Sequence, residues 1–103
     1  MEKETKAIVV KVDEELKDIV PDYLSKMRVD IKLIKSGLSE NDMEKIRVVG
    51  HQLKGSGGGY GFDYITEVGM AIEKAAKASD AQEILKQVQL FTNFLDQVEV
   101  VYE

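Results

Sequence analysis

Residues 43–61 read MEKIRVVGHQLKGSGGGYG, and the first half of this stretch has the pattern of a helix with one buried face. Ile46, Val49 and Leu53 follow one another at spacings of three and four residues, which is the period of an amphipathic α-helix. Glycines crowd the second half, and each glycine destabilises a helix by about 1 kcal/mol relative to alanine. The stretch therefore predicts a helix that ends among these glycines.

The same helical period occurs on both sides of this stretch. Apolar side chains recur every three or four residues over residues 21–38, 63–79 and 79–102. We expect a shorter helix from Asp13 to Val20 to close one end of the molecule, and we assign Phe91, Phe94, Tyr102 and the methionines to the core. Because the connections are short, the sequence predicts an all-α fold, an antiparallel four-helix bundle.

Residues that start or stop helices mark the expected boundaries. Gly37 is expected to end the helix of residues 21–38 in a left-handed conformation. Ser39 with Asp42 resembles a capping box for the next helix. Asp63 is expected to cap the helix of residues 63–79, and Ser79-Asp80 is expected to open the last helix.

Length and composition limit the classes of function. A chain of 103 residues has room for one domain, which we place at residues 13–103 after an extended segment at residues 1–12. Within that segment, Ile8–Val12 is β-branched, so a strand is the alternative. The net charge of -5 disfavours nucleic acid and membranes as partners, and there is no cysteine, no secretory signal and no apolar run near the ~20 residues of a membrane span. We expect a cytoplasmic protein.

His51 is the single histidine, and its direction on the helix follows from the helical period. At about 100° per residue, His51 points about 140° away from the buried direction and therefore faces water. The residues that share this outward side are Arg47, Val48, Lys54, Gly55 and Gly58. An outward glycine weakens the helix and packs against nothing, so its use is to let another molecule come close. A histidine in this setting indicates a docking face, although a lone exposed histidine is often only a surface residue.

The segment His51-Gln52-Leu53-Lys54-Gly55-Ser56, followed by Gly58-Gly59, resembles the signature of histidine-containing phosphotransfer (HPt) domains. The similarity extends from about residue 12 to residue 102. It implies that His51 accepts a phosphoryl group, that Lys54 is the family's basic residue and Gly55 its small residue, and that Glu73 bonds to the histidine. Judged from the residues alone, Lys54 and Glu73 are equally compatible with solvated side chains, and Lys77 is expected on a solvated face.

The resemblance also implies the partners. An HPt domain carries a phosphoryl group between receiver-domain aspartates and works with a histidine kinase, which can be a hybrid kinase, without an ATP site of its own. The partner receiver domain would bring Mg²⁺, since the sequence shows no metal-ligand pattern and we expect no intrinsic cofactor. We expect a monomer. Two alternatives stay open: the phosphate-accepting domain of a chemotaxis-type histidine kinase, and a helical adaptor that is never phosphorylated.

Overall fold

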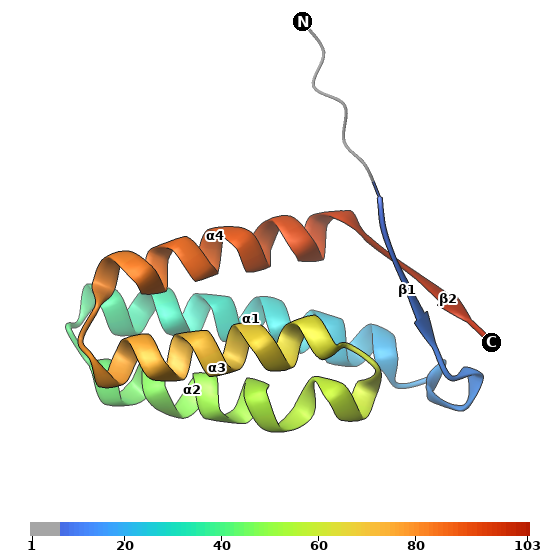
Figure 1. Cartoon of the computed structure of the whole chain (residues 1–103), viewed down its shortest axis with the longest axis horizontal. Helices are drawn as coiled ribbons and strands as arrows, with labels where there is room; N and C mark the ends of the chain where they lie inside the picture. The colour runs from blue at the N-terminus through green and yellow to red at the C-terminus, as the bar shows by residue number, and fades with distance from the viewer. Residues whose placement is uncertain (1–6) are drawn as a thin grey trace, which may run out of the picture.

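The computed structural model describes residues 7–103, so the part of the expected extended segment at residues 1–6 lies outside it. Four helices lie side by side (Figure 1). They are α1 Val20–Ser39, α2 Met43–Ser56, α3 Asp63–Lys77 and α4 Ala81–Gln97. Short connections make successive helices run in opposite directions. The prediction of a four-helix architecture is confirmed.

The apolar stripes of the four helices meet in one core. Its fully buried members include Ile34 of α1, Ile46 of α2, Ile72 of α3 and Phe91 of α4. Burying an aliphatic or aromatic side chain of this size contributes roughly 1.5–3 kcal/mol, so the core stabilises the bundle more than any local helix propensity does. Not every methionine is in the core as expected, because Met70 is 53% exposed.

A small sheet corrects the all-α expectation. Ile8–Val12 forms strand β1, which pairs in parallel with strand β2, Val98–Tyr102, so that Val10 lies opposite Val100. The expected continuation of the last helix to residue 102 is therefore wrong. Every second side chain of β2 packs against the core, namely Val98, Val100 and Tyr102. This alternation suits a β-branched strand better than a helix.

The expected helix from Asp13 to Val20 is also wrong. Only Glu14–Leu16 is helical there, as a single 3-10 turn (η1) in which the Asp13 side chain accepts a hydrogen bond from the Glu15 backbone nitrogen at 2.8 Å. The Glu14 nitrogen donates to the carbonyl of Glu103, at the end of β2. The sheet thus holds the start of this segment, which acts as a turn into α1.

The boundary between α1 and α2 differs from the expectation for Gly37 and Ser39. Gly37 is buried inside α1, which continues through Ser39, and a Cβ atom on Gly37 would lie only 2.7 Å from the Ile46 side chain. The left-handed residue is Asn41, with φ of 57°, and the cap of α2 is Asp42, whose side chain accepts from the Lys45 nitrogen at 3.0 Å. Gly37 therefore serves close packing between helices.

Of the two remaining predicted helix starts, one is confirmed and one is wrong. Asp80 caps α4 as expected, accepting from the Glu83 nitrogen at 3.1 Å. Asp63 is the first residue of α3 instead of its cap, and the cap position is held by Phe62 without a side-chain hydrogen bond. Phe62 is buried, so packing determines this helix start.

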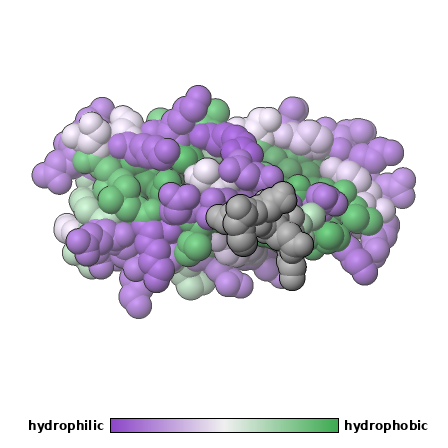
Figure 2. All heavy atoms as spheres, turned by 90° about the horizontal axis from the view of Figure 1, so that it is seen from above, coloured by the Kyte–Doolittle hydropathy of each residue, from purple (hydrophilic) through white to green (hydrophobic). Residues whose placement is uncertain are grey.

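The surface is mostly hydrophilic on the side where α4 lies, with hydrophobic areas between the polar side chains (Figure 2). Leu85 and Leu90 are among the exposed apolar side chains of α4. Within residues 7–103, the helices are too short or too polar to cross a lipid bilayer.

Candidate functional site

His51 lies in the middle of α2, on the side turned away from the core. Ile46, Val49 and Leu53 point inward and are buried, while the His51 side chain is 63% exposed. The outward direction inferred from the helical period is thus observed.

Glu73 of α3 holds one edge of the histidine ring. Its Oε2 atom lies 3.0 Å from Nδ1 of His51, and the Glu73 residue is only 7% exposed. An ionised carboxylate only accepts hydrogen bonds, so Nδ1 carries the proton and donates it. Nε2 then keeps its lone pair on the opposite side of the ring, away from Glu73. The alternative of a solvated Glu73 is wrong.

Lys54 binds the other oxygen of the same carboxylate. Its Nζ atom lies 2.8 Å from Oε1 of Glu73. The hydrogen bond from Lys54 is the main cause that lowers the pKa of Glu73, and the bond from His51 adds to it, although burial acts in the opposite direction. Glu73 therefore stays ionised at neutral pH and joins the histidine and the lysine in one cluster.

Two glycines let α2 and α3 come close enough to form this cluster. A Cβ atom on Gly50 would lie 2.7 Å from the backbone nitrogen of Glu73, and one on Gly69 would overlap the backbone of Lys54. Without side chains at these positions the two helices touch backbone to backbone. This contact brings Glu73 next to the segment that carries His51 and Lys54.

Gly55 and Val48 lie on open surface beside His51. A Cβ atom on Gly55 would have no neighbour within 4 Å, and Val48 is 39% exposed. Arg47 is less free, since its guanidinium donates to both oxygens of Glu44 at 2.6 and 2.9 Å.

Gly58 is exposed but does not lie on α2. It begins the 3-10 turn η2, Gly58–Tyr60, and its nitrogen donates to Oγ1 of Thr66 at 2.8 Å. The helical angle that grouped Gly58 with His51 is wrong because α2 ends at Ser56. Gly58 belongs to the turn that carries the chain from α2 to α3.

Two residues of α3 on either side of Glu73 were not among the predicted site residues. Lys77 is four residues after Glu73 on α3, and its Nζ lies 3.9 Å from Oε2 of Glu73. Met70 is three residues before Glu73 and exposed. Once Glu73 is a candidate site residue, the i,i+4 spacing predicts that Lys77 lies beside it. The exposure of Met70, in contrast, depends on how α3 packs.

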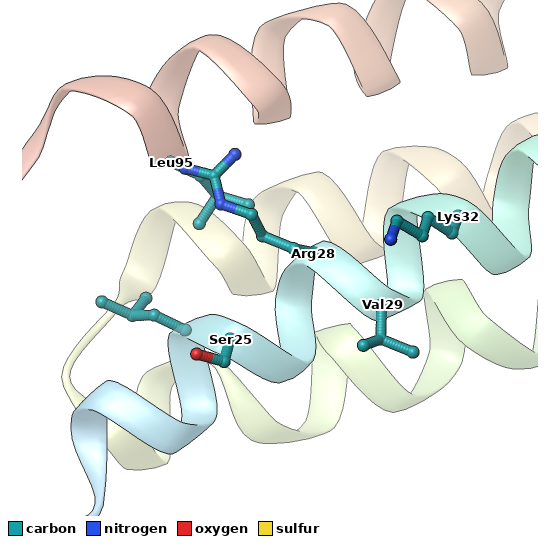
Figure 3. A pocket seen from close by; sticks show the side chains of 6 residues that line it. Ser25, Arg28, Val29, Lys32 and Leu95 are labelled. Atoms are coloured by element: carbon teal, nitrogen blue, oxygen red, sulfur yellow. The ribbon is translucent and has the colours of Figure 1, made fainter.

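A groove between α1 and α4 is a separate feature (Figure 3). Its volume is about 380 Å³, and its lining residues are Leu24, Ser25, Arg28, Val29, Lys32 and Leu95. Arg28 reaches across to Asp96 of α4 at 2.9 Å. Since no residue of α2 or α3 lines it, this groove is not part of the His51 site.

Metal ligands do not gather at the site. Among residues 7–103, no three histidine, cysteine, aspartate or glutamate side chains lie close enough together to hold a metal ion. What the described cluster offers is an exposed histidine ring with Nδ1 on Glu73 and Nε2 on the other side, a buried carboxylate behind the ring, and an ammonium group on that carboxylate.

The comparison with protein families agrees with this geometry. The family model of the Hpt domain matches residues 18–100, which is most of the chain. No curated protein and no solved structure matches the chain. Hpt domains are phosphocarriers in phosphorelay signalling, where they work with receiver domains and histidine kinases. With four helices and a match over residues 18–100, this chain belongs to the Hpt domain family.

Proposed function

We propose that Nε2 of His51 accepts a phosphoryl group from the aspartyl phosphate of a receiver domain and passes it to the aspartate of another. The observation that carries this proposal is the 3.0 Å contact between Nδ1 of His51 and the buried Glu73, on a ring that is 63% exposed. This contact leaves the nucleophilic nitrogen on the open side of the ring.

The transfer requires no proton to leave the histidine. The Nε2 lone pair forms a bond to phosphorus while the bond from phosphorus to the aspartyl oxygen breaks, and the electron pair of that bond stays on the aspartate. Nδ1 keeps its proton, so the phosphorylated ring is positively charged. The Glu73 carboxylate stabilises that charge across the hydrogen bond, and in the return step the ring leaves as a neutral imidazole.

Lys54 supplies positive charge for the transferring group. Phosphoryl transfer gathers negative charge on the oxygens around phosphorus, and an adjacent ammonium group lowers its energy. The whole chain carries a net charge of -5, so a local cation is needed for an anionic group to approach His51.

The partner docks on the open face around His51. Gly55 and Val48 provide the contact surface, with Arg47 and Gly58 at its margin. In-line attack brings the reacting atoms to roughly 3 Å, so the partner surface must come close to α2, and Gly55 leaves room for it. The receiver domain brings Mg²⁺, because residues 7–103 offer no ligand cluster for it.

The proposal also covers where the chain works, its oligomeric state, its partners, its domain bounds and its lack of kinase activity. The chain works in the cytoplasm as a monomer, with proteins and not nucleic acid or membranes as partners, and its acidic surface supports this choice. The carrier domain spans residues 13–103, and strand β1, Ile8–Val12, packs onto it through its pairing with β2. The carrier has no kinase activity of its own.

The test is incubation of the protein with a receiver domain that carries a radiolabelled aspartyl phosphate. We expect acid-labile, base-stable label on the wild type and none on His51→Gln, with the same melting temperature for both because the ring is mostly exposed. Docking without label would identify an adaptor, and label on His51→Gln would place the acceptor elsewhere.

A further inference from the structure

We propose that Lys77 is a positioning residue, which takes over the ion pair with Glu73 when Lys54 turns to the phosphoryl group on His51. This inference rests on the proposed function, since it concerns the phosphorylated state of the same site. It assigns a role to a lysine that the sequence places on a solvated face.

Glu73 is shared by three partners. Oε1 binds Nζ of Lys54 at 2.8 Å, whereas Oε2 binds Nδ1 of His51 at 3.0 Å and has Nζ of Lys77 at 3.9 Å. The carboxylate is nearly buried, while the Lys77 side chain is 62% exposed. In the unphosphorylated protein, Lys54 therefore makes the close ion pair with Glu73. Lys77 stays near the longest distance at which an ion pair forms.

Phosphorylation places two anions in competition for Lys54. A phosphoryl group adds nearly two negative charges and three strong acceptor oxygens beside His51. If Lys54 turns towards those oxygens, Oε1 of Glu73 loses its ion pair, and Glu73 keeps only the bond from the charged ring to Oε2. Leaving one oxygen of a buried carboxylate unpaired is unfavourable. A second cation that moves in restores the lost ion pair and helps to keep Glu73 behind Nδ1.

Lys77 is suited to this movement. Its Nζ needs to approach by only about 1 Å to reach the 2.7–2.9 Å of a charged hydrogen bond. Its exposed side chain has room to rotate, and the i,i+4 spacing on α3 keeps it beside Glu73.

The formal charges favour the same exchange. Before phosphorylation, the carboxylate of Glu73 faces two ammonium groups, so the cluster carries one excess positive charge. The phosphoryl group adds more negative charge than this excess. Without Lys77, the negative charge of Glu73 and the phosphoryl group together would exceed the positive charge of Lys54 and the protonated ring. Lys77 thus lets Lys54 serve the phosphoryl group while Glu73 still orients the ring.

The test compares Lys77→Met with Lys74→Met and Lys77→Arg. Lys74 is a matched control because it is exposed on the same helix and makes no ion pair with residues 7–103. Phosphoramidate serves as the phosphodonor: its P–N bond breaks, ammonia leaves, and Nε2 of His51 takes the phosphoryl group. The loading rate is measured at low salt, together with the melting temperature. NMR of the lysine ammonium groups follows the mobility of Lys54 and Lys77 before and after loading.

We expect Lys77→Met to load about three- to fivefold more slowly than Lys74→Met, the size of one solvent-screened ion pair. Lys77→Arg should restore the rate, and the melting temperatures of the two methionine variants should agree. In the wild type, the Lys77 ammonium should be mobile before loading and restrained after it. Equal loading rates of Lys77→Met and Lys74→Met would overturn the inference, as would a Lys77 equally restrained in both states. A wild type that takes no label from phosphoramidate or from a receiver overturns the proposed function as well.

Discussion

Replacing Gly55 with isoleucine separates a docking role from a packing role. A Cβ atom at this position has no neighbour within 4 Å, so the new side chain enters open space and disturbs no internal contact. Replacing a glycine in a helix interior with alanine stabilises the helix by up to about 1 kcal/mol, and replacing it with β-branched isoleucine stabilises the helix less. We therefore expect Gly55→Ala to raise the melting temperature and Gly55→Ile to leave it unchanged or slightly higher.

The same substitution should impair transfer. The partner must bring phosphorus to roughly 3 Å from Nε2, and a misplacement of about 1 Å costs on the order of a hundredfold in rate. An isoleucine one turn after His51 stands between the two surfaces. We expect transfer from a phosphorylated receiver to fall by at least about tenfold in rapid-quench measurements.

Gly50→Ala is the contrasting control. Its Cβ would lie 2.7 Å from the backbone of Glu73, so this variant should lose stability where Gly55→Ala gains it. A Gly55→Ile protein that is destabilised and still transfers at the wild-type rate would refute the docking argument. Loading by phosphoramidate, which needs no docking surface, should stay within about twofold of the wild type in Gly55→Ile.

Other substitutions test the cluster and the core. Lys54→Ala should slow transfer up to about fivefold without stopping it, since it removes one screened cation, and an unchanged rapid-quench rate at low salt would contradict this role. Glu73→Ala should move the His51 proton from Nδ1 towards Nε2, and ring ¹⁵N NMR with an unchanged tautomer ratio would exclude the orienting bond. Burial raises the pKa of Asp30 above 3.8 despite its bond to Lys26, so its ionisation opposes folding as the pH rises through the folded pKa. Asp30→Asn should therefore be more stable, relative to wild type, at pH 7 than at pH 3 in thermal melts, and a difference independent of pH would argue against this.

Local pattern was enough to predict the four long helices and the face of His51, but not to exclude a helix from Asp13 to Val20. The period of Ile46, Val49 and Leu53 defines an inner side of α2, and any residue on the same helix then has a known direction. The helical period gave the wrong position for Gly58, because an angle of about 100° per residue applies only as far as the helix continues.

Helix ends and the sheet were not readable from local pattern. Val98 and Tyr102 by themselves also fit a helical stripe, and the strand forms because β1, which lies about ninety residues earlier in the chain, pairs with this segment. Gly37 has the residue type of a helix stop, but its place against Ile46 makes it a packing residue. Such contacts between distant segments override local preference.

The sequence by itself therefore determined which histidine is exposed, which lysine and glycine follow it on α2, and that four amphipathic helices form the domain. Only the tertiary structure decided that Glu73 reaches Nδ1 of His51 and Lys54 at the same time. The physical reason is that this cluster depends on the distance between two helices. That distance is set by the backbone contact at Gly50 and Gly69, and no pattern within either helix specifies how those glycines meet.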